Sequence, residues 1–350
     1  MEFFKKYKFF GGRIIKTGIA VFLTALICDL LSWPPMFAVI TAIVTIEPTA
    51  AHSIKKALVR FPASALGAAF SVFFNFVFGD SPFTYMLVAV LTIIVCYKLQ
   101  LHDGTLVAVL TGVAMISTVH DHFLSSFFVR LGTTGIGLTV SALVNFLVIK
   151  PNYSLTIKSK LHQYIIETGK LIEERGKEIV LQQPIHQNTK VKFERLWKDI
   201  ETVDTLCEYQ KQEWKLHHNI NRKDTKEFHY EYKKLSTLRQ MIFHVANLMA
   251  IPPLDAPICK EKSVELMFHS IKQTLHEKEY QMDEEHHQVV KEIRSIFKHC
   301  VQEDKINQAH IALLYELLSI HDLIEELHQI QLLKQKHQKL IQYKGAKADM

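Results

Sequence analysis

Hydrophobic residues are concentrated in the first 150 positions, where long apolar segments alternate with short breaks. The breaks contain Trp33-Pro34-Pro35, Gly79-Asp80-Ser81-Pro82 and His102-Asp103-Gly104, which are typical of turns. About 20 mostly apolar residues cross the hydrocarbon core of a bilayer. The pattern therefore predicts six membrane helices, of which the second, fourth and fifth are short, at residues 14–33, 35–51, 57–78, 82–98, 104–120 and 127–149.

The remaining residues, 151–350, alternate charged and apolar positions at helical spacing. Breaks such as Gln183-Pro184 and Pro252-Pro253 separate six further predicted helices, and Gly169 and Gly176 weaken the first of them. The predicted fold is all-α, with a transmembrane domain at 1–150 and a soluble helical bundle with a structural and oligomerising role at 151–350. The expected helices of the bundle span residues 155–182, 190–218, 224–250, 260–279, 284–300 and 305–341.

Charge divides the chain at the same place. Residues 1–150 hold 11 Lys or Arg and 6 Asp or Glu, whereas residues 151–350 hold 30 and 29. The net charge of +6 lies almost wholly in the apolar half, so it is no argument for a nucleic-acid partner. If the N-terminus is retained and cytoplasmic, ten basic residues of this half face inward and Arg130 alone faces outward. The positive-inside rule then predicts a cell-membrane protein with both termini in the cytoplasm.

The apolar half repeats itself. Shifting residues 38–78 by seventy positions onto 108–148 gives 11 identities in 41 positions without a gap. Each unit, at about 14–79 and 82–149, holds three helices, so the second unit inserts upside down relative to the first. Inverted repeats are a recurrent plan of transporters. The alternative is a chance resemblance between helices rich in small residues. The identical positions are Ala38, Val39, Thr41, Ile46, His52, Val59, Arg60, Gly67, Ser71, Asn75 and Phe76.

The repeat pairs Arg60 with Arg130 and Asn75 with Asn145, which are the substrate-path candidates. Each arginine is expected near the start of its helix, where free N–H groups and the helix dipole attract anions. The alternative for Arg60 is an anchor at the inner membrane surface. That alternative is weaker for Arg130, which runs against the charge bias.

Small residues follow at steps of four, with Gly67 and Ser71 in the first unit and Gly137 and Ser141 in the second. Such stripes let helix backbones approach closely, so helix packing is the predicted role. The alternative is that they line a polar pathway across the membrane.

Ionisable groups near the membrane are costly and therefore candidates for proton coupling. Asp29, Glu47 and His52 fall in this class, and the alternative for each is an interfacial side chain that reaches water. Two histidine pairs of the second half, His217-His218 and His286-His287, are expected on solvated surface. The cluster His120-Asp121-His122 lacks a third anchored ligand, so no metal site and no cofactor are predicted.

Enzymatic activity is not expected either, because no pair of nucleophile and base is evident. The five cysteines show no paired spacing and are expected to be free thiols.

The segment from Trp33 to Gly67 resembles the fusaric acid resistance and aromatic acid exporter superfamily. The resemblance is carried by Trp33, Thr41, Pro48, Arg60 and Gly67, and it covers the first 150 residues well. Phe61-Pro62-Ala63 departs from the family's Gly-Thr approach, whereas the second unit keeps Gly132-Thr133 after its arginine. The six helices with a helical tail look like the shorter Gram-positive members. The resemblance implies efflux of organic anions, aromatic carboxylates among them.

These observations lead to a proton-coupled exporter of organic anions as the first hypothesis. A passive organic-anion channel is the second, and a membrane-anchored scaffold or sensor is the third. Expected partners are small organic anions, membrane lipid and further copies of the same chain.

Overall fold

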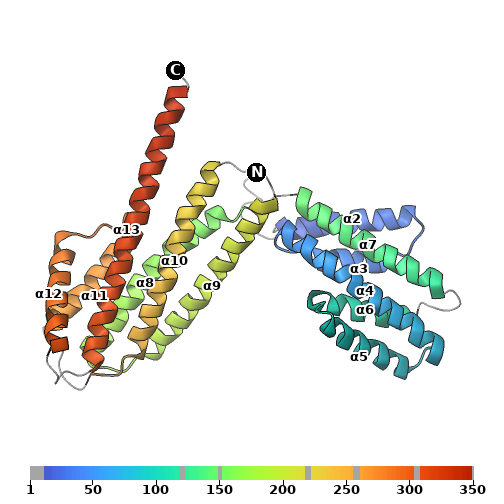
Figure 1. The fold of residues 1–350 in the computed structure, drawn as a ribbon, viewed down its shortest axis with the longest axis horizontal. Helices are drawn as coiled ribbons and strands as arrows, with labels where there is room; N and C mark the ends of the chain where they lie inside the picture. Colours follow the sequence, from blue (N-terminus) through green and yellow to red (C-terminus); the bar gives the residue numbers. More distant parts are fainter. Residues whose placement is uncertain are drawn as a thin grey trace, which may run out of the picture. The chain divides into compact units, whose positions relative to one another are not determined.

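The computed structural model describes residues 12–117, 123–148, 152–216, 222–254, 261–302 and 308–348. Twelve α-helices and one 3-10 turn make up the described secondary structure, which contains no strand. The prediction of an all-α chain is therefore confirmed for these residues. The helices fall into two compact units (Figure 1). The first is formed by residues 1–152 together with 209–218, and the second by residues 153–208 and 219–350.

The first unit contains six helices and the 3-10 turn η1 at His102–Gly104. Local signals set several of their ends: Thr49 caps α4 by accepting from the His52 amide at 3.1 Å, and Ser81 caps α5 ahead of Pro82. Gly79, at a φ of 64°, closes α4. The helices are α2 (Gly12–Leu30), α3 (Met36–Thr45), α4 (Ala50–Phe78), α5 (Pro82–Lys98), α6 (Thr105–Ile116) and α7 (Phe123–Leu147).

The third helix of each half packs on the other half. Helix α7 lies against α2 and α3, whereas α4 lies against α5 and α6, and α4 and α7 also contact each other (Figure 1). Each half is therefore completed by a helix from the other half.

The first unit has large apolar side chains on its outside and small polar ones inside. Exposed residues include Phe22, Phe76 and Leu124, which are 66%, 74% and 73% accessible. Its interior instead holds hydroxyl side chains with almost no exposure, among them Thr24, Thr41, Thr84, Thr92, Thr111, Thr133, Thr134 and Ser141. This distribution suits a unit surrounded by lipid, where small residues mediate helix packing.

Two helices of the described chain are both long and apolar enough to cross a membrane, at Ala50–Phe78 and Leu124–Leu147. Three shorter apolar helices are Met36–Thr45, Pro82–Lys98 and the segment His102–Ile116. The predicted second helix (35–51) and fifth helix (104–120) are therefore too long, because α3 ends at Thr45 and α6 at Ile116. The predicted third helix (57–78) begins seven residues too late, because α4 begins at Ala50. Pro48 explains the first error, because a residue before proline avoids the helical region.

The second unit contains α8 (Ser154–Val180), α10 (Arg222–Ala250), α11 (Glu261–His276), α12 (Glu284–Gln302), α13 (Gln308–Ala348) and most of α9 (Gln187–Leu216). Helix α8 packs on α10 and α11, α10 also packs on α13, and α12 packs on α11 and α13 (Figure 1). Helix α8 is continuous through both of its glycines. Gly176 lies against the ring of Phe268 so closely that a Cβ would overlap it, which explains glycine there.

Candidate functional site

Arg60, on the third turn of α4, is a buried cation each of whose three nitrogens donates a hydrogen bond. Nη2 lies 3.0 Å from the Glu47 carboxylate, Nη1 donates to the Val44 carbonyl at 3.1 Å, and Nε donates to the Asp103 carbonyl at 3.2 Å. Lys56 is a second cation at the same carboxylate, at 3.2 Å. The Arg60 guanidinium thus has a paired carboxylate and a partner for every nitrogen.

Arg130, seventy residues later on α7, is equally buried but differently surrounded. Nη2 donates to Thr111 Oγ1 at 3.1 Å, and the guanidinium carbon lies 3.5 Å from the centre of the Phe37 ring. Nε and Nη1 are buried without a hydrogen-bond partner among the described residues, and no carboxylate there pairs with this arginine. Since a buried charge normally requires a counter-ion, the arrangement leaves the cation ready for an anion.

A row of hydroxyl groups connects the neighbourhoods of the two arginines. Ser64, one turn after Arg60, lies 3.0 Å from Thr111 Oγ1 and 3.5 Å from Thr134 Oγ1. The same Thr111 oxygen accepts from Arg130. All three hydroxyl residues are buried, and Ser64 and Thr134 mark the place where α4 and α7 meet.

The segment that follows α3, residues 46–49, is not helical, and side chains rather than helix hydrogen bonds hold it in place. Asn145 Nδ2 donates to the carbonyls of Glu47 and Thr49 at 3.0 and 3.1 Å and to Ser53 Oγ at 2.7 Å. Ser53 in turn donates to the Thr45 carbonyl and accepts from the Glu47 amide. Irregular backbone persists inside a membrane where protein groups satisfy it in this way. The break places the Glu47 carboxylate beside Arg60.

Asn145 also binds a buried cation, because Lys16 Nζ donates to its Oδ1 at 2.7 Å and to its carbonyl at 3.2 Å. Asn75, seventy residues earlier, donates to the carbonyl of Ile116 at the end of α6 at 3.0 Å. Both asparagines thus fasten the end of a short helix, α3 or α6.

The expectation that the two arginines lie at helix starts is wrong. Arg60 follows the first residue of α4 by ten positions, and Arg130 follows the first residue of α7 by seven. The free N–H groups of a helix belong to its first turn, so neither arginine is assisted by them. Their surroundings are side chains and carbonyl groups from other helices.

His52 lies at the start of α4, where the end of α9 joins the first unit. Its Nδ1 is 2.9 Å from Gln212 Oε1, and the backbone N–H of Ala50 donates to the Glu213 carboxylate. A carboxylate at a helix N-terminus is favourable because of the helix dipole. His52 is therefore connected to α9 rather than to the arginines.

The glycines of the two stripes bring helix backbones into contact at equivalent positions. A Cβ on Gly67 would overlap the carbonyl of Ala108, and one on Gly137 would overlap the carbonyl of Ala38. Ala108 follows Ala38 by seventy residues, just as Gly137 follows Gly67. The α4–α6 and α7–α3 contacts thus have the same construction.

The two serines of the small-residue stripes, Ser71 and Ser141, and Asp29 lie apart from the surroundings of Arg60 and Arg130. Ser141 donates to the carbonyl of Gly137 on its own helix, and the hydroxyl of Ser71 is buried without a partner among the described residues. Asp29 is exposed near the end of α2, and no described side chain pairs with its carboxylate.

Some histidines of the second unit are buried and others are exposed. His286 is completely buried between Ser270 and His321, whose Nδ1 lies 3.0 Å from His286 Nε2. The expectation of solvated surface is therefore wrong for His286, although its neighbour His287 is exposed. The pair His217-His218 and the cluster His120-Asp121-His122 lie outside the described residues. Ligand atoms of His321, Asp322 and Glu325 lie within 4.8 Å of one another, but both carboxylates are exposed and Asp322 also pairs with Arg294.

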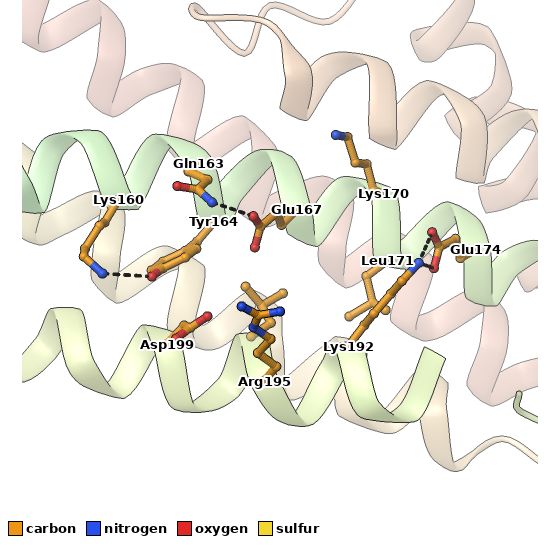
Figure 2. Close-up of a pocket in the computed structure, with 11 residues that line it drawn as sticks. Lys160, Gln163, Tyr164, Glu167, Lys170, Leu171, Glu174, Lys192, Arg195 and Asp199 are labelled. Atoms are coloured by element: carbon orange, nitrogen blue, oxygen red, sulfur yellow. Dashed lines mark hydrogen bonds and ion pairs between the residues drawn. The ribbon is translucent and has the colours of Figure 1, made fainter. Parts of the chain in front are cut away.

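A groove between α8 and α9 collects charges of both signs (Figure 2). Two of its three carboxylates are occupied: Lys192 binds Glu174 at 2.7 Å, and Gln163 donates to Glu167 at 2.7 Å. Lys170 points away from these groups in Figure 2. Four basic side chains line the groove against three carboxylates, so its net charge is only about one positive unit.

Several residues of the centre are not evident from sequence. Thr111 stands out only because the repeat aligns it with Thr41, and Lys16 is one of several basic residues near the N-terminus. Phe37 and Ser64 carry no signal in the sequence. The Glu213 contact joins positions 163 residues apart, which no local pattern reveals.

Comparison with known proteins agrees with the membrane-type unit. Residues 8–148 match the family described as "Aromatic acid exporter family member 1". Over 344 residues the chain is 41% identical to a UPF0421 protein of Bacillus cereus, across 93% of this chain and 95% of that relative. The chain belongs to the aromatic acid exporter family.

Further relatives align with this chain over both of its units. A UPF0421 protein of Oceanobacillus iheyensis is 40% identical over 334 residues, which are 92% of this chain and 96% of the relative. One of Staphylococcus haemolyticus is 37% identical over 329 residues, 91% and 96% of the two chains. The family is one of membrane exporters and not of enzymes, so the chain is a membrane protein.

Proposed function

We propose that the chain exports small organic anions, aromatic carboxylates among them, and that Arg130 binds the carboxylate. The observation that carries this proposal is a buried guanidinium with two unpartnered nitrogens and no paired carboxylate among the described residues. A carboxylate accepts two parallel N–H bonds from neighbouring guanidinium nitrogens, and Nη2 has a second N–H that can form such a pair with one of the unpartnered nitrogens. The face of the Phe37 ring covers the cation from one side.

The architecture that we propose is an inverted 3+3 repeat with six crossings and both termini in the cytoplasm. It is supported by the exchanged packing of α4 and α7 and by the equivalent glycine contacts. Helix α3 rises about 15 Å over its ten residues, which is about half of a hydrocarbon core of about 30 Å. An irregular segment, residues 46–49, follows it, as in transporters with broken helices.

Glu47 is the proposed coupling group. While ionised, it neutralises Arg60 and Lys56. A proton that enters from outside and binds Glu47 would release Arg60 for a carboxylate arriving from the cytoplasm. The hydroxyl groups of Ser64 and Thr111 lead from there to Arg130, where the anion leaves. Glu47 then loses its proton to the cytoplasm and pairs with Arg60 again, so one proton enters for each anion exported.

The test is flux from proteoliposomes loaded with benzoate, 4-hydroxybenzoate or succinate, with and without a pH gradient. We expect uphill movement that follows the gradient in the wild type, downhill movement only in Glu47→Gln, and none in Arg130→Met. Arg13→Met, which removes an exposed arginine of the same unit, is the matched control and should move anions normally.

Other outcomes assign the other functions. Voltage-driven flux that is unchanged by Glu47→Gln would make the protein an anion channel. No flux of any acid, with the protein correctly folded and oriented, would leave the scaffold hypothesis.

A further inference from the structure

A second concentration of positive charge lies in the second unit, away from the groove of Figure 2. Helices α8, α10 and α13 and the turn after α11 enclose a pocket of about 520 Å³. Four lysines line it, together with one carboxylate, that of Glu231. The lysines come from four different segments and are Lys158, Lys234, Lys278 and Lys334.

Two of these lysines are neutralised by carboxylates and two are not. Lys334 pairs with Glu231 and lies 3.6 Å from Glu227, which also binds Lys158 at 3.1 Å. Lys234 and Lys278 form no ion pair with any described residue. The pocket thus keeps an excess of about two positive charges after its own pairs are counted.

Lys234 is the informative member because it is only 6% exposed. Its Nζ donates to Gln331 Oε1 at 2.6 Å and lies 5.2 Å from the centre of the Tyr280 ring, which are neutral partners. Burial, which Glu231 opposes and the charges of Lys334 and Lys158 reinforce, lowers the pKa of Lys234 to about 8. A lysine held in this way gains from an incoming anion.

His162, which lies on α8 and lines the pocket, is affected by the same excess of positive charge. Burial lowers its pKa first, and then the positive charges of Lys234, Lys278 and His276 lower it, whereas Glu231 raises it. The groups that face the pocket from every side therefore repel a further cation.

Tyr280 supplies the apolar floor. It is buried to 98% and has a φ of 52°, a left-handed conformation that is disfavoured for a tyrosine. Burial and the Glu231 charge raise the pKa of its phenol, so the hydroxyl keeps its proton. Strained residues of this kind concentrate at ligand sites.

We propose that this pocket binds a small anion with two or more negative charges, as an effector site distinct from the export path. Lys234 and Lys278 supply the two unpaired ammonium groups, and Tyr280 and Leu161 provide apolar contact. The shared chemistry is a pair of carboxylate or phosphate groups, for which lysine acts as a point charge.

The test is isothermal titration of the full chain in detergent, at constant ionic strength, with citrate, inorganic pyrophosphate and benzoate. We expect citrate or pyrophosphate to bind at pH 7 and benzoate to bind at least tenfold more weakly at this site. Lys278→Ala removes an exposed rim charge without disturbing the fold and should weaken binding about tenfold. Lys234→Met should weaken it further. Lys170→Ala, which removes one charge from the groove of Figure 2, is the matched control and should change affinity less than twofold.

A second readout addresses Lys234 itself. An amine-reactive acylating reagent should modify this lysine faster as the pH rises through about 8, and citrate or pyrophosphate should protect it. Which of the two probes protects identifies the anion as a polycarboxylate or a phosphate.

The proposal is overturned by any of three results: no binding of either multivalent probe, equal loss in Lys170→Ala and Lys278→Ala, or undiminished binding in Lys234→Met. Each of these outcomes is independent of anion flux through the first unit.

Discussion

Arg60 and Arg130 occupy equivalent positions seventy residues apart, are buried to the same degree and are surrounded differently. Three nitrogens of Arg60 donate to protein oxygens, including a carboxylate, whereas one nitrogen of Arg130 does so. The residue seventy positions after Glu47 is Ser117, which carries no charge. The repeat thus explains where the cations lie, and the uncharged residue at position 117 explains why Arg130, unlike Arg60, has no paired carboxylate among the described residues.

The comparison predicts opposite effects on stability for the same substitution at the two arginines. Arg60→Met leaves Glu47 with Lys56 as its remaining cation and should lower the free energy of unfolding by about 3 kcal/mol. Arg130→Met removes an unsatisfied buried charge and should leave stability unchanged or raise it. Scanning fluorimetry in detergent compares the two midpoints with that of the wild type.

Anion flux measured on the same proteins should show that Arg130→Met is inactive although it is stable. Arg130→Met should lose flux by about 100-fold or more despite its stability, because truncating one side of a desolvated charge pair costs at least about 2–5 kcal/mol. If Arg130→Met unfolds as readily as Arg60→Met, Arg130 is a structural group and the comparison fails.

Acid should lower the stability of the second unit through a buried histidine that has no counterpart in the proposed coupling mechanism of the first unit. In the second unit, burial first and then the positive charges of His321 and His287 lower the pKa of His286 to about 4, against the effect of Asp283. The unfolded chain binds this proton near pH 6.5, so stability is complete above that value and falls between pH 6.5 and 4 by about 3 kcal/mol. Thermal unfolding of the full chain across this range measures the loss.

His286→Gln keeps a hydrogen-bonding side chain and should flatten that pH dependence. Its flux should respond to a pH gradient as in the wild type, because the proposed coupling group is Glu47. His287→Gln, an exposed neighbour, should reproduce the wild-type curve. A curve unchanged by His286→Gln would assign acid sensitivity to other groups.

The smallest expected effect concerns the threonines at equivalent positions of α3 and α6. Thr111→Val removes the hydrogen bond that orients Arg130 among the described residues and should weaken apparent substrate affinity about tenfold. Thr41 donates only within its own helix, to the Phe37 carbonyl, so Thr41→Val should stay within about twofold. Concentration dependence of flux provides both numbers, and equal effects at the two sites would remove Thr111 from the path.

Sequence predicts which segments are helical, because apolar length is a local signal, and the seventy-residue shift pairs Arg60 with Arg130. It misplaces both arginines at helix starts, because α4 and α7 begin ten and seven residues before them. It predicts the partners of the arginines poorly. Glu47 reaches Arg60 only because α3 ends at Thr45, and that end is stabilised by Asn145 from a distant helix. Burial of His286 likewise depends on His321, 35 residues away. Such contacts are created by packing and leave no periodic trace in the chain.

The exchanged packing of α4 and α7 also has a consequence for synthesis. Helices α2 and α3 leave the ribosome first, but α7, the helix that covers them, is made only after α4, α5 and α6. Lys16 therefore waits for Asn145, 129 residues later, before its charge is bound. Neither half of the unit is a complete folding nucleus, so a nascent chain stopped before Leu147 keeps polar groups unpaired inside the bilayer and becomes a substrate for membrane quality control.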